Sequence, residues 1–301
     1  MEKQAYGAVV ALEGSEDLAI SIAKSLRVPF DIDKDTAKIT VFKDNESKLT
    51  LQSTHAGQNV MLVARLFPNP PEKVLEFLVL ARALKDNGAS IHAVLPYLAY
   101  ARQDRAFLPG ELVTIRELSE LMKGIVEEVI TVNIHSEEAK EQFAASLKDV
   151  SAMPLLAHYA KEIIKAKSKS IVVVSPDEGG IERARAFASE IGAEKAIALD
   201  KERDRITGEI TTKDIADNLA GKTAIIIDDM IATGGTVVNA ANVLRRHNAK
   251  EIYVMAVHGL FLDEADKKIK EAGANEIITT NTINNKYAKV DISEVLADAL
   301  R

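Results

Sequence analysis

Short β-branched runs alternate with longer stretches of helical periodicity along this 301-residue chain. The runs predicted as strands are 59–64, 90–95, 128–132, 170–174, 222–227 and 251–257. Between them, residues 74–87 and 237–247 carry apolar side chains at three- and four-residue spacing, which is typical of amphipathic helices. This alternation predicts an α/β fold, with mostly parallel sheets flanked by helices.

The pattern also repeats within the chain. Residues 60–63, 84–94 and 128–133 resemble residues 224–227, 244–254 and 276–281, in the same order. The alternative is a chance likeness between αβ units, but three matches in one order favour two related domains. We place them at 1–150 and 151–301, and allow for the last helix to pack back on the first domain.

The loops after the matching strands 60–63 and 224–227 differ in chemistry. In the second half, residues 228–236 read Asp-Asp-Met-Ile-Ala-Thr-Gly-Gly-Thr, whereas residues 64–71 of the first half hold three prolines and no glycine pair. Glycines let a backbone approach a ligand closely, and the N–H groups at a helix start attract anions. We therefore expect an anion site in the second half only.

The acids beside this loop indicate the kind of anion. Asp228 and Asp229 cannot bind phosphate, but they can accept hydrogen bonds from sugar hydroxyls. Thr233 and Thr236 add hydroxyl donors next to the backbone N–H groups. A phosphate on one side and a diol on the other describe a pentose phosphate, while the alternative is a strand end followed by an ordinary capped helix.

Composition narrows the remaining chemistry. The chain has no cysteine, which excludes disulfides, thiolate metal sites and a cysteine nucleophile. Its 38 Lys and Arg against 45 Asp and Glu give a net charge of −7, which argues against nucleic acid or anionic membranes as partners. Without a signal-peptide pattern or a long apolar run, a cytoplasmic protein is expected.

Several segments resemble a known family. Residues 228–236 are similar to the phosphoribosyl diphosphate (PRPP) loop of the type I phosphoribosyltransferase fold. Residues 97–105, Tyr-Leu-Ala-Tyr-Ala-Arg-Gln-Asp-Arg, resemble the ATP-binding stretch of the ribose-phosphate pyrophosphokinases, and the likeness covers nearly the whole chain. The Thr-Gly-Gly-Thr form and the short chain favour an archaeal-type member.

The resemblance assigns the ATP-binding residues. Arg102 and Gln103 match the most distinctive part of the ATP-binding stretch. Asp44, Asn45 and Glu46 match a Phe-Pro-Asp-Gly-Glu loop that helps to hold the base, often from the neighbouring subunit. Here Lys and Asn replace the usual Pro and Gly at positions 43 and 45.

It also assigns the metal and the catalytic loop. Residues 175–180 resemble the diphosphate loop, which gives Asp177 as a Mg²⁺ ligand together with Gly179 and Gly180, and His135 matches a second metal or phosphate contact. Lys201 and Arg203 resemble the Lys-x-Arg pair of the flexible catalytic loop, followed by a lid at 204–214. The residues implied for ribose 5-phosphate are Arg203, Asp228, Asp229, Ala232, Thr233, Gly234, Gly235 and Thr236.

The activity implied is transfer of the β,γ-diphosphoryl group of ATP to the C1 hydroxyl of ribose 5-phosphate, giving PRPP and AMP with Mg²⁺ as cofactor. A homo-oligomer, at least a dimer, is implied by the shared base-binding loop, with no nucleic acid or membrane partner. The alternatives are a phosphoribosyltransferase, a non-catalytic regulatory homologue of the synthetase, and a nucleic-acid-binding regulator on the same fold.

Overall fold

The computed structural model describes residues 6–164, 170–199, 201–203, 210–212 and 218–301. The chain divides into two compact units. One contains Met1–Ser151 together with Ile292–Arg301, and the other contains Ala152–Asp291. The last ten residues, Ile292–Arg301, therefore group with the first unit.

The first unit is built on a seven-stranded sheet of order β3-β2-β1-β4-β5-β6-β7, in which only the β2–β3 pair is antiparallel. Its strands are β1 (Ala8–Leu12), β2 (Thr36–Val41), β3 (Ser47–Thr50), β4 (Asn59–Val63), β5 (Ser90–Val94), β6 (Glu128–Val132) and β7 (Leu147–Val150). The central strands are buried along almost their whole length, as expected for a parallel sheet that is covered on both faces.

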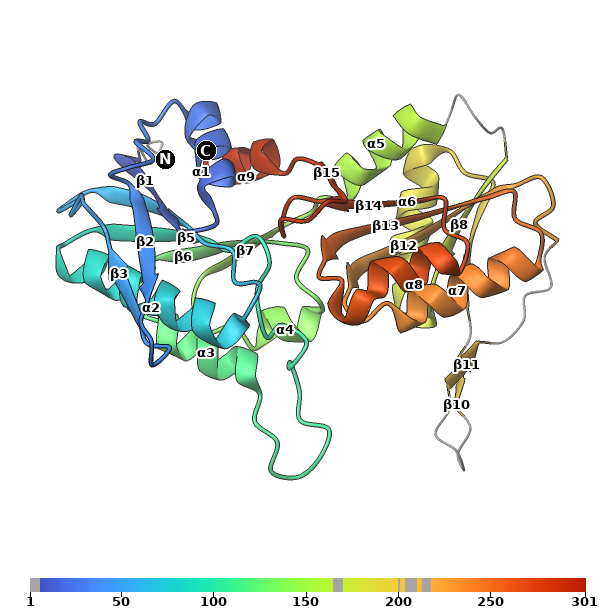
Figure 1. Cartoon of the computed structure of the whole chain (residues 1–301), viewed down its shortest axis with the longest axis horizontal. Coiled ribbons are helices and arrows are strands. Elements are labelled where there is room, and N and C mark those ends of the chain that lie inside the picture. The colour runs from blue at the N-terminus through green and yellow to red at the C-terminus, as the bar shows by residue number, and fades with distance from the viewer. Residues whose placement is uncertain (1–5, 165–169, 200, 204–209, 213–217) are drawn as a thin grey trace. The chain divides into compact units, whose positions relative to one another are not determined.

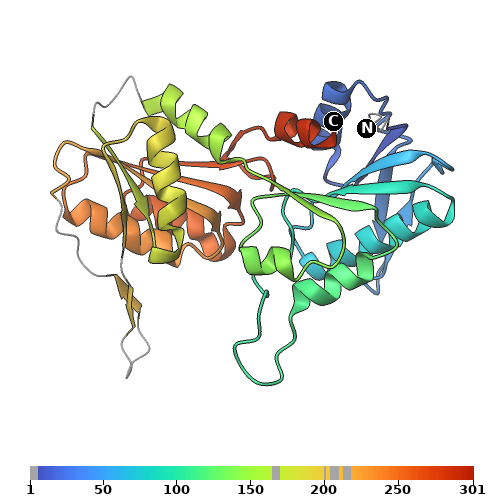
Figure 2. The same ribbon diagram turned by 180° about the vertical axis from the view of Figure 1, so that it is seen from behind.

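Helices cover both faces of this sheet. They are α1 (Glu16–Leu26), α2 (Pro70–Asp86), α3 (Thr114–Met122), α4 (Glu137–Glu141) and α9 (Ser293–Leu300). Figures 1 and 2 show α1 and α9 side by side on one face, with α2 and α3 on the other. The α1–α9 contact is closed by a hydrogen bond from Ser25 Oγ to Glu294 Oε1 (2.7 Å) and another from Arg301 Nη2 to the Ser25 carbonyl (3.0 Å).

The second unit has a six-stranded, fully parallel sheet of order β15-β14-β13-β12-β8-β9. Its strands are β8 (Ile171–Ser175), β9 (Lys195–Ala198), β12 (Thr223–Ile231), β13 (Glu251–Gly259), β14 (Glu276–Thr280) and β15 (Ala288–Val290). Strands β10 (Lys201–Arg203) and β11 (Ile210–Thr212) form a separate antiparallel ribbon. Its helices are α5 (Met153–Ile164), α6 (Ile181–Ile191), α7 (Gly235–Arg246) and α8 (Ala265–Glu271), with short 3₁₀ turns η1 (Glu178–Gly180) and η2 (Leu262–Glu264). Helices α7 and α8 cover one face, and α5 and α6 cover the other (Figures 1 and 2).

The two sheets share one strand order. Across the first unit, β2-β1-β4-β5-β6-β7 corresponds strand by strand to β9-β8-β12-β13-β14-β15 of the second. The three sequence matches fall on β4 and β12, β5 and β13, and β6 and β14, which hold the same places in their sheets. The prediction of two α/β sheets, mostly parallel and flanked by helices, is confirmed.

All six predicted strands form, with bounds that agree within one residue for four of them and differ more at the ends of the other two. Strand β12 continues to Ile231 and β13 to Gly259, because the backbone pairing runs on through Asp228↔Ala256 and Met230↔His258. Both predicted helices also begin earlier, at Pro70 for α2 and at Gly235 for α7. Within the described ranges, the helices are too short or too polar to cross a bilayer.

Because α9 supplies buried apolar surface to the first unit, Leu296→Ala should destabilise that unit. Leu296 is fully buried, and such truncations typically cost about 2–5 kcal/mol of unfolding free energy. The same change at Leu121, which is 60% exposed on α3, should cost about 0.5 kcal/mol or less. Urea unfolding gives both values, and hydrogen exchange should quicken in α1 before α5 and α6. Equal losses in the two variants would contradict this packing.

Candidate active site

Three neighbouring strands of the second unit, β8, β12 and β13, end at the same edge of their sheet. In a parallel sheet this carboxyl edge collects the loops that follow the strands, and ligands bind there. The loops that follow are 176–180, 232–234 and 260–262. The third supports the second, because the N–H groups of Leu260 and Leu262 donate to the carbonyls of Ile231 (2.9 Å) and Ala232 (3.0 Å).

The loop after β12 leads directly into the N-terminus of α7. The first helical hydrogen bond runs from the Val238 N–H to the Gly234 carbonyl (2.8 Å). The N–H groups of the first helical residues precede this bond and have no carbonyl partner within the helix. Thr233 is exposed and Thr236 half-buried at the same place. Backbone and hydroxyl donors therefore gather where the sequence predicts an anion site.

The two glycines of this loop have different structural reasons. Gly234 has φ of 75°, and a Cβ there would lie 2.9 Å from Ala265 Cβ and 3.3 Å from Ile269 Cδ1. A Cβ at Gly235 would meet no described heavy atom within 4 Å. Gly234 is thus required by the packing of α7 on α8. At Gly235, the missing side chain instead leaves the backbone of the loop open to a ligand.

The predicted sugar-binding acids lie at the end of β12 beside a cation. Arg183 Nη1 donates to Asp228 Oδ1 (2.9 Å) and forms an ion pair with Asp229 Oδ1 (3.2 Å). The Asp229 N–H donates to Asp228 Oδ1 (2.9 Å), which holds the Asp228 carboxylate beside its neighbour. Burial, and then the adjacent Asp229, raise the pKa of Asp228 well above its usual value, and Arg183 opposes this rise.

The diphosphate loop after β8 is a compact capped turn. Asp177 Oδ1 accepts a hydrogen bond from the Gly180 N–H (3.3 Å), and Ser175 Oγ donates to the Asp177 carbonyl (2.6 Å). A Cβ at Gly180 would lie 2.5 Å from Ser175 Oγ, so this position requires glycine. Gly179 is exposed at the tip of the turn.

Arg183 is a site residue that the sequence reasoning missed. The sequence places it three residues after Gly180, on the helix that follows the diphosphate loop. The sequence shows only a cation in the first turn of that helix. This position does not reveal that the partners of Arg183 are two acids 45 and 46 positions further along the chain.

In the first unit, the predicted ATP stretch and His135 lie on neighbouring strand ends. Ser136 Oγ, next to His135, donates to the buried Asp104 Oδ2 (2.5 Å), which follows Gln103. Burial alone raises the pKa of Asp104, but Ser136 and Arg105 lower it below its usual value. Because Asp104 is tied to Ser136, the loops after β5 and β6 are held together.

Arg102 and Gln103 are exposed at this place. The Gln103 side-chain carbonyl accepts a hydrogen bond from Thr114 Oγ1 (2.6 Å) at the start of α3. Gln103 is therefore held by α3, and Arg102 offers an exposed cation beside it.

The predicted base-binding loop is the turn of the β2–β3 hairpin. Asn45 has φ of 66°, the left-handed conformation that Gly adopts most readily, and the Phe42 N–H donates to the Glu46 carbonyl (2.8 Å). The Glu46 N–H donates to Asp44 Oδ1 (3.1 Å). Strand β2 lies three places from β5 in the sheet, about 14 Å at the usual strand spacing, so this turn and the loop of Arg102 leave the sheet at separate places.

The predicted catalytic residues Lys201 and Arg203 lie in β10, whose backbone pairs with β11 through Lys201↔Thr212 and Arg203↔Ile210. Their side chains lie outside the described part of the chain, as do Asp200 and most of the predicted lid at 204–214.

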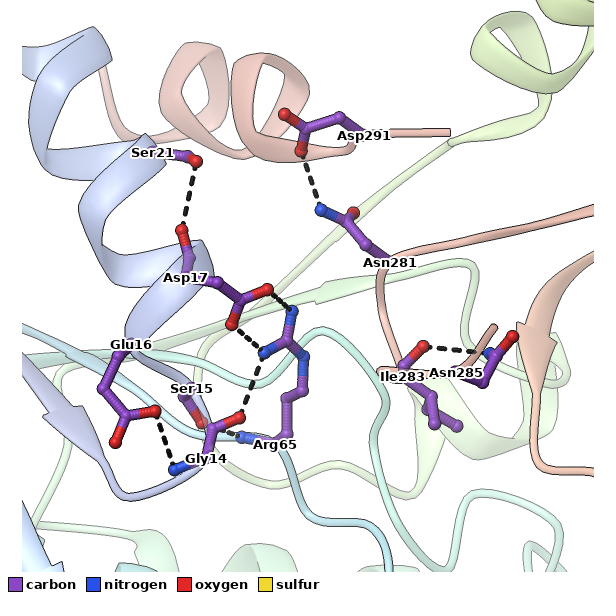
Figure 3. Close-up of polar contacts among 10 residues, drawn as sticks. All are labelled: Gly14, Ser15, Glu16, Asp17, Ser21, Arg65, Asn281, Ile283, Asn285 and Asp291. Atoms are coloured by element: carbon purple, nitrogen blue, oxygen red, sulfur yellow. Dashed lines mark hydrogen bonds and ion pairs between the residues drawn. The ribbon is translucent and has the colours of Figure 1, made fainter. Parts of the chain in front are cut away.

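The loop after β4 in the first unit corresponds to the loop after β12 in the second. Here the strand end carries the cation, Arg65, and the helix carries the acid, Asp17 (Figure 3). Arg65, 4% exposed just after β4, donates to Asp17 Oδ1 (2.5 Å) and Oδ2 (3.0 Å) and to the Gly14 carbonyl (3.1 Å). Its backbone N–H donates to Ser15 Oγ (2.9 Å). Burial raises the pKa of Asp17, but the guanidinium holds it below its usual value. A buried cation here stands where the second unit has the predicted sugar-binding acids.

No group of three or more His, Asp or Glu side chains that could hold a metal ion occurs among the described residues. Of the two predicted ligands, His135 is half-buried in the first unit and Asp177 is half-buried in the second.

Because Gly234 is required by packing, Gly234→Ala should cost more stability than a change at another left-handed glycine. Gly221 has φ of 78° and no described heavy atom within 4 Å of a Cβ, so Gly221→Ala carries only the backbone penalty of about 1–2 kcal/mol. Overpacking against Ala265 should add about 1–3 kcal/mol in Gly234→Ala. Urea unfolding of both variants measures the difference, and equal values would rule out the contact with α8.

Comparison with known proteins places this site in a family. Residues 8–125 match the family model for the N-terminal domain of ribose phosphate pyrophosphokinase, and residues 205–301 match the phosphoribosyl synthetase-associated domain. The chain is 38% identical to a ribose-phosphate pyrophosphokinase of Sulfurisphaera tokodaii, over 85% of this chain and 87% of that one. It is 30% identical to the enzyme of that name from Methanothermobacter thermautotrophicus, over 97% and 99% of the two chains.

A solved structure agrees along the whole length. The crystal structure of phosphoribosylpyrophosphate synthetase from Mycobacterium smegmatis has a TM-score of 0.84 at 28% identity and covers 98% of both chains. The resemblance that the ATP stretch and the PRPP loop indicate is therefore confirmed. The chain belongs to the ribose-phosphate pyrophosphokinases, the enzymes that supply PRPP for nucleotide biosynthesis.

Proposed function

We propose that the chain transfers the β,γ-diphosphoryl group of ATP to the C1 hydroxyl of ribose 5-phosphate, with the sugar phosphate bound by the second unit. The observation that carries this proposal is the pairing of an anion-binding helix start with two adjacent carboxylates at one sheet edge. The C1 oxygen forms a bond to the β-phosphorus of ATP, the bond to the α,β-bridging oxygen breaks, and AMP leaves.

The two halves of ribose 5-phosphate have different partners. The loop Ala232, Thr233, Gly234, Gly235 and Thr236 binds the 5-phosphate through backbone N–H groups and hydroxyls. Asp228 and Asp229 accept hydrogen bonds from the ribose hydroxyls. This orientation directs the C1 hydroxyl away from the phosphate loop, because the ring spans the distance between the two groups.

ATP is held by Arg102 and Gln103, and its base by the turn Asp44–Glu46 of a second copy of the chain. The separation of β2 from β5 by three strand places supports the second copy, because it favours a turn supplied by another chain over the turn of the same sheet. The working enzyme is therefore at least a dimer. A cytoplasmic location, with no nucleic acid or membrane partner, is part of this proposal, because both proposed substrates are small water-soluble molecules.

The residues present fit Mg²⁺. This ion keeps several waters and is usually bound by one or two carboxylates together with substrate phosphates, so no cage of protein ligands is needed. Asp177 would hold it, and His135 would contact it or a phosphate. When bound, Mg²⁺ neutralises charge on the phosphate oxygens.

Lys201 and Arg203 stabilise the negative charge on the diphosphoryl group as it is transferred. Phosphoryl transfer depends mainly on positioning and on charge stabilisation, so no covalent intermediate with the protein is required. The Lys-x-Arg spacing supports this role, because residues two apart on an extended segment share one side of it.

Purified protein given ATP, Mg²⁺ and ribose 5-phosphate should release AMP and PRPP in equal amounts, as measured by chromatography of the nucleotides. Omission of ribose 5-phosphate should abolish AMP release. A phosphoribosyltransferase would consume PRPP with a base instead, and a regulatory homologue would release no AMP. Either result would overturn the proposed reaction.

Lys201→Ala should lower kcat by about 100-fold or more, with either KM changed far less, because its charge is needed chiefly in the transition state. Steady-state kinetics with each substrate varied in turn measures this split. Lys250→Ala, which removes an exposed lysine just before β13, is the matched control and should keep wild-type values. An unchanged kcat in Lys201→Ala would remove Lys201 from the catalytic step.

A further inference from the structure

We propose that Arg183 is a positioning residue for ribose 5-phosphate, which holds the carboxyl groups of Asp228 and Asp229 side by side so that both face the ribose hydroxyls. This inference rests on the proposed function, since it gives a role to a residue beside the same site. Arg183 acts through the two acids and needs no contact with the substrate.

The geometry shows a single nitrogen shared by two acids. Arg183 Nη1 lies 2.9 Å from Asp228 Oδ1 and 3.2 Å from Asp229 Oδ1. The side chains of the two acids are 19% and 10% exposed, so water screens them poorly. The same Asp228 oxygen also accepts the Asp229 N–H. The carboxylates are therefore fixed relative to each other by one cation and one backbone bond.

The turn before α6 is shaped for this contact. A Cβ at Gly180 would lie 3.4 Å from Arg183 Nη1, as well as 2.5 Å from Ser175 Oγ. A side chain at position 180 would therefore displace Ser175 Oγ from the capped turn, while it would only come into ordinary contact with the guanidinium. The glycine lets the diphosphate loop and the cation pack together, and this links the loop after β8 to the acids on β12.

Electrostatics supply the reason for a cation here. Two largely buried carboxyl groups that lie beside the same nitrogen disfavour each other's charged form, and such pairs tend to share one proton. Burial and Asp229 raise the pKa of Asp228, and the charge that opposes them is Arg183 from α6. Without Arg183, the pair would keep its shared proton up to a higher pH. A protonated carboxyl loses acceptor capacity, so one ribose hydroxyl would lose its partner.

The alternative is a purely structural ion pair. The first unit has one at the corresponding place, where Asp17 on α1 binds Arg65 after β4, although no sugar loop follows. A test of Arg183 therefore needs a readout that simple loss of stability does not change.

Arg183→Gln should raise the KM for ribose 5-phosphate about 10-fold or more and leave the KM for ATP within about twofold. The matched control is Arg185→Gln, since Arg185 lies on the same helix, is exposed, and pairs only locally with Glu182 among the contacts described. Both KM values of that control should equal those of the wild type. Calorimetric titration of ribose 5-phosphate without ATP should show the same loss of affinity, independent of turnover.

The pH profile separates positioning from structure. The ratio of the ribose 5-phosphate KM in Arg183→Gln to that in the wild type should fall as the pH is raised, because the acid pair then loses its shared proton. A structural defect would give a ratio that does not change with pH. Arg183→Lys keeps a cation but not its planar fork, so its KM should lie between the two.

Thermal unfolding of each variant checks that it is folded. If Arg183→Gln does not fold, the ribose 5-phosphate KM of Arg183→Lys is the value that tests the positioning role. A ribose 5-phosphate KM and affinity equal to those of Arg185→Gln, or a ratio that is constant with pH, would overturn the positioning role. Wild-type protein that binds ribose 5-phosphate but releases no AMP would instead overturn the proposed reaction, and the binding arm would still test Arg183.

Discussion

In a parallel sheet, every strand delivers the loop that follows it to the same edge, and both units of this chain depend on that constraint. Strands β8 and β12 are neighbours, so Asp177 and the acids of β12 reach one edge from positions about 50 residues apart. Strands β5 and β6 do the same in the first unit, where Ser136 ties the His135 loop to Asp104. The chemistry of each unit is thus decided by short loops on a shared frame.

The two frames carry opposite charges at matching places. In the second unit, the strand end contributes the acids and the preceding helix contributes Arg183, whereas in the first unit the strand end contributes Arg65 and the helix contributes Asp17. Both arrangements satisfy the same electrostatic need, since each joins a helix start to a strand end. Only the arrangement in the second unit places carboxylates beside a glycine loop. That unit alone therefore offers acceptors for a diol next to donors for a phosphate.

The sequence predicts the strands and the anion loop because both depend on local pattern, namely β-branched runs and a glycine pair before a helix. It does not predict that β12 continues through Asp228, because backbone pairing with β13 does not depend on side-chain polarity. Nor does it show why Gly234 is needed, since the atom that excludes a side chain belongs to Ala265 on another helix. The Arg183 contact was missed for the same reason, because its partners come from a different strand. The placement of the turn at Asp44 follows from strand order, which local pattern does not contain.

A net charge of −7 first argues against partners as anionic as ATP and ribose 5-phosphate. The cation that lies nearest to the sugar acids does not remove this difficulty, because Arg183 is shared by two carboxylates and the three groups together keep a negative charge. Attraction of phosphate must therefore come from groups that are not paired with these acids. In the second unit, these include the N–H groups at the start of α7, which carry partial positive charge. This explains why the acids and the glycine loop occur together: the carboxylates can select the sugar only if the phosphate is held by a part of the backbone whose charge they do not neutralise.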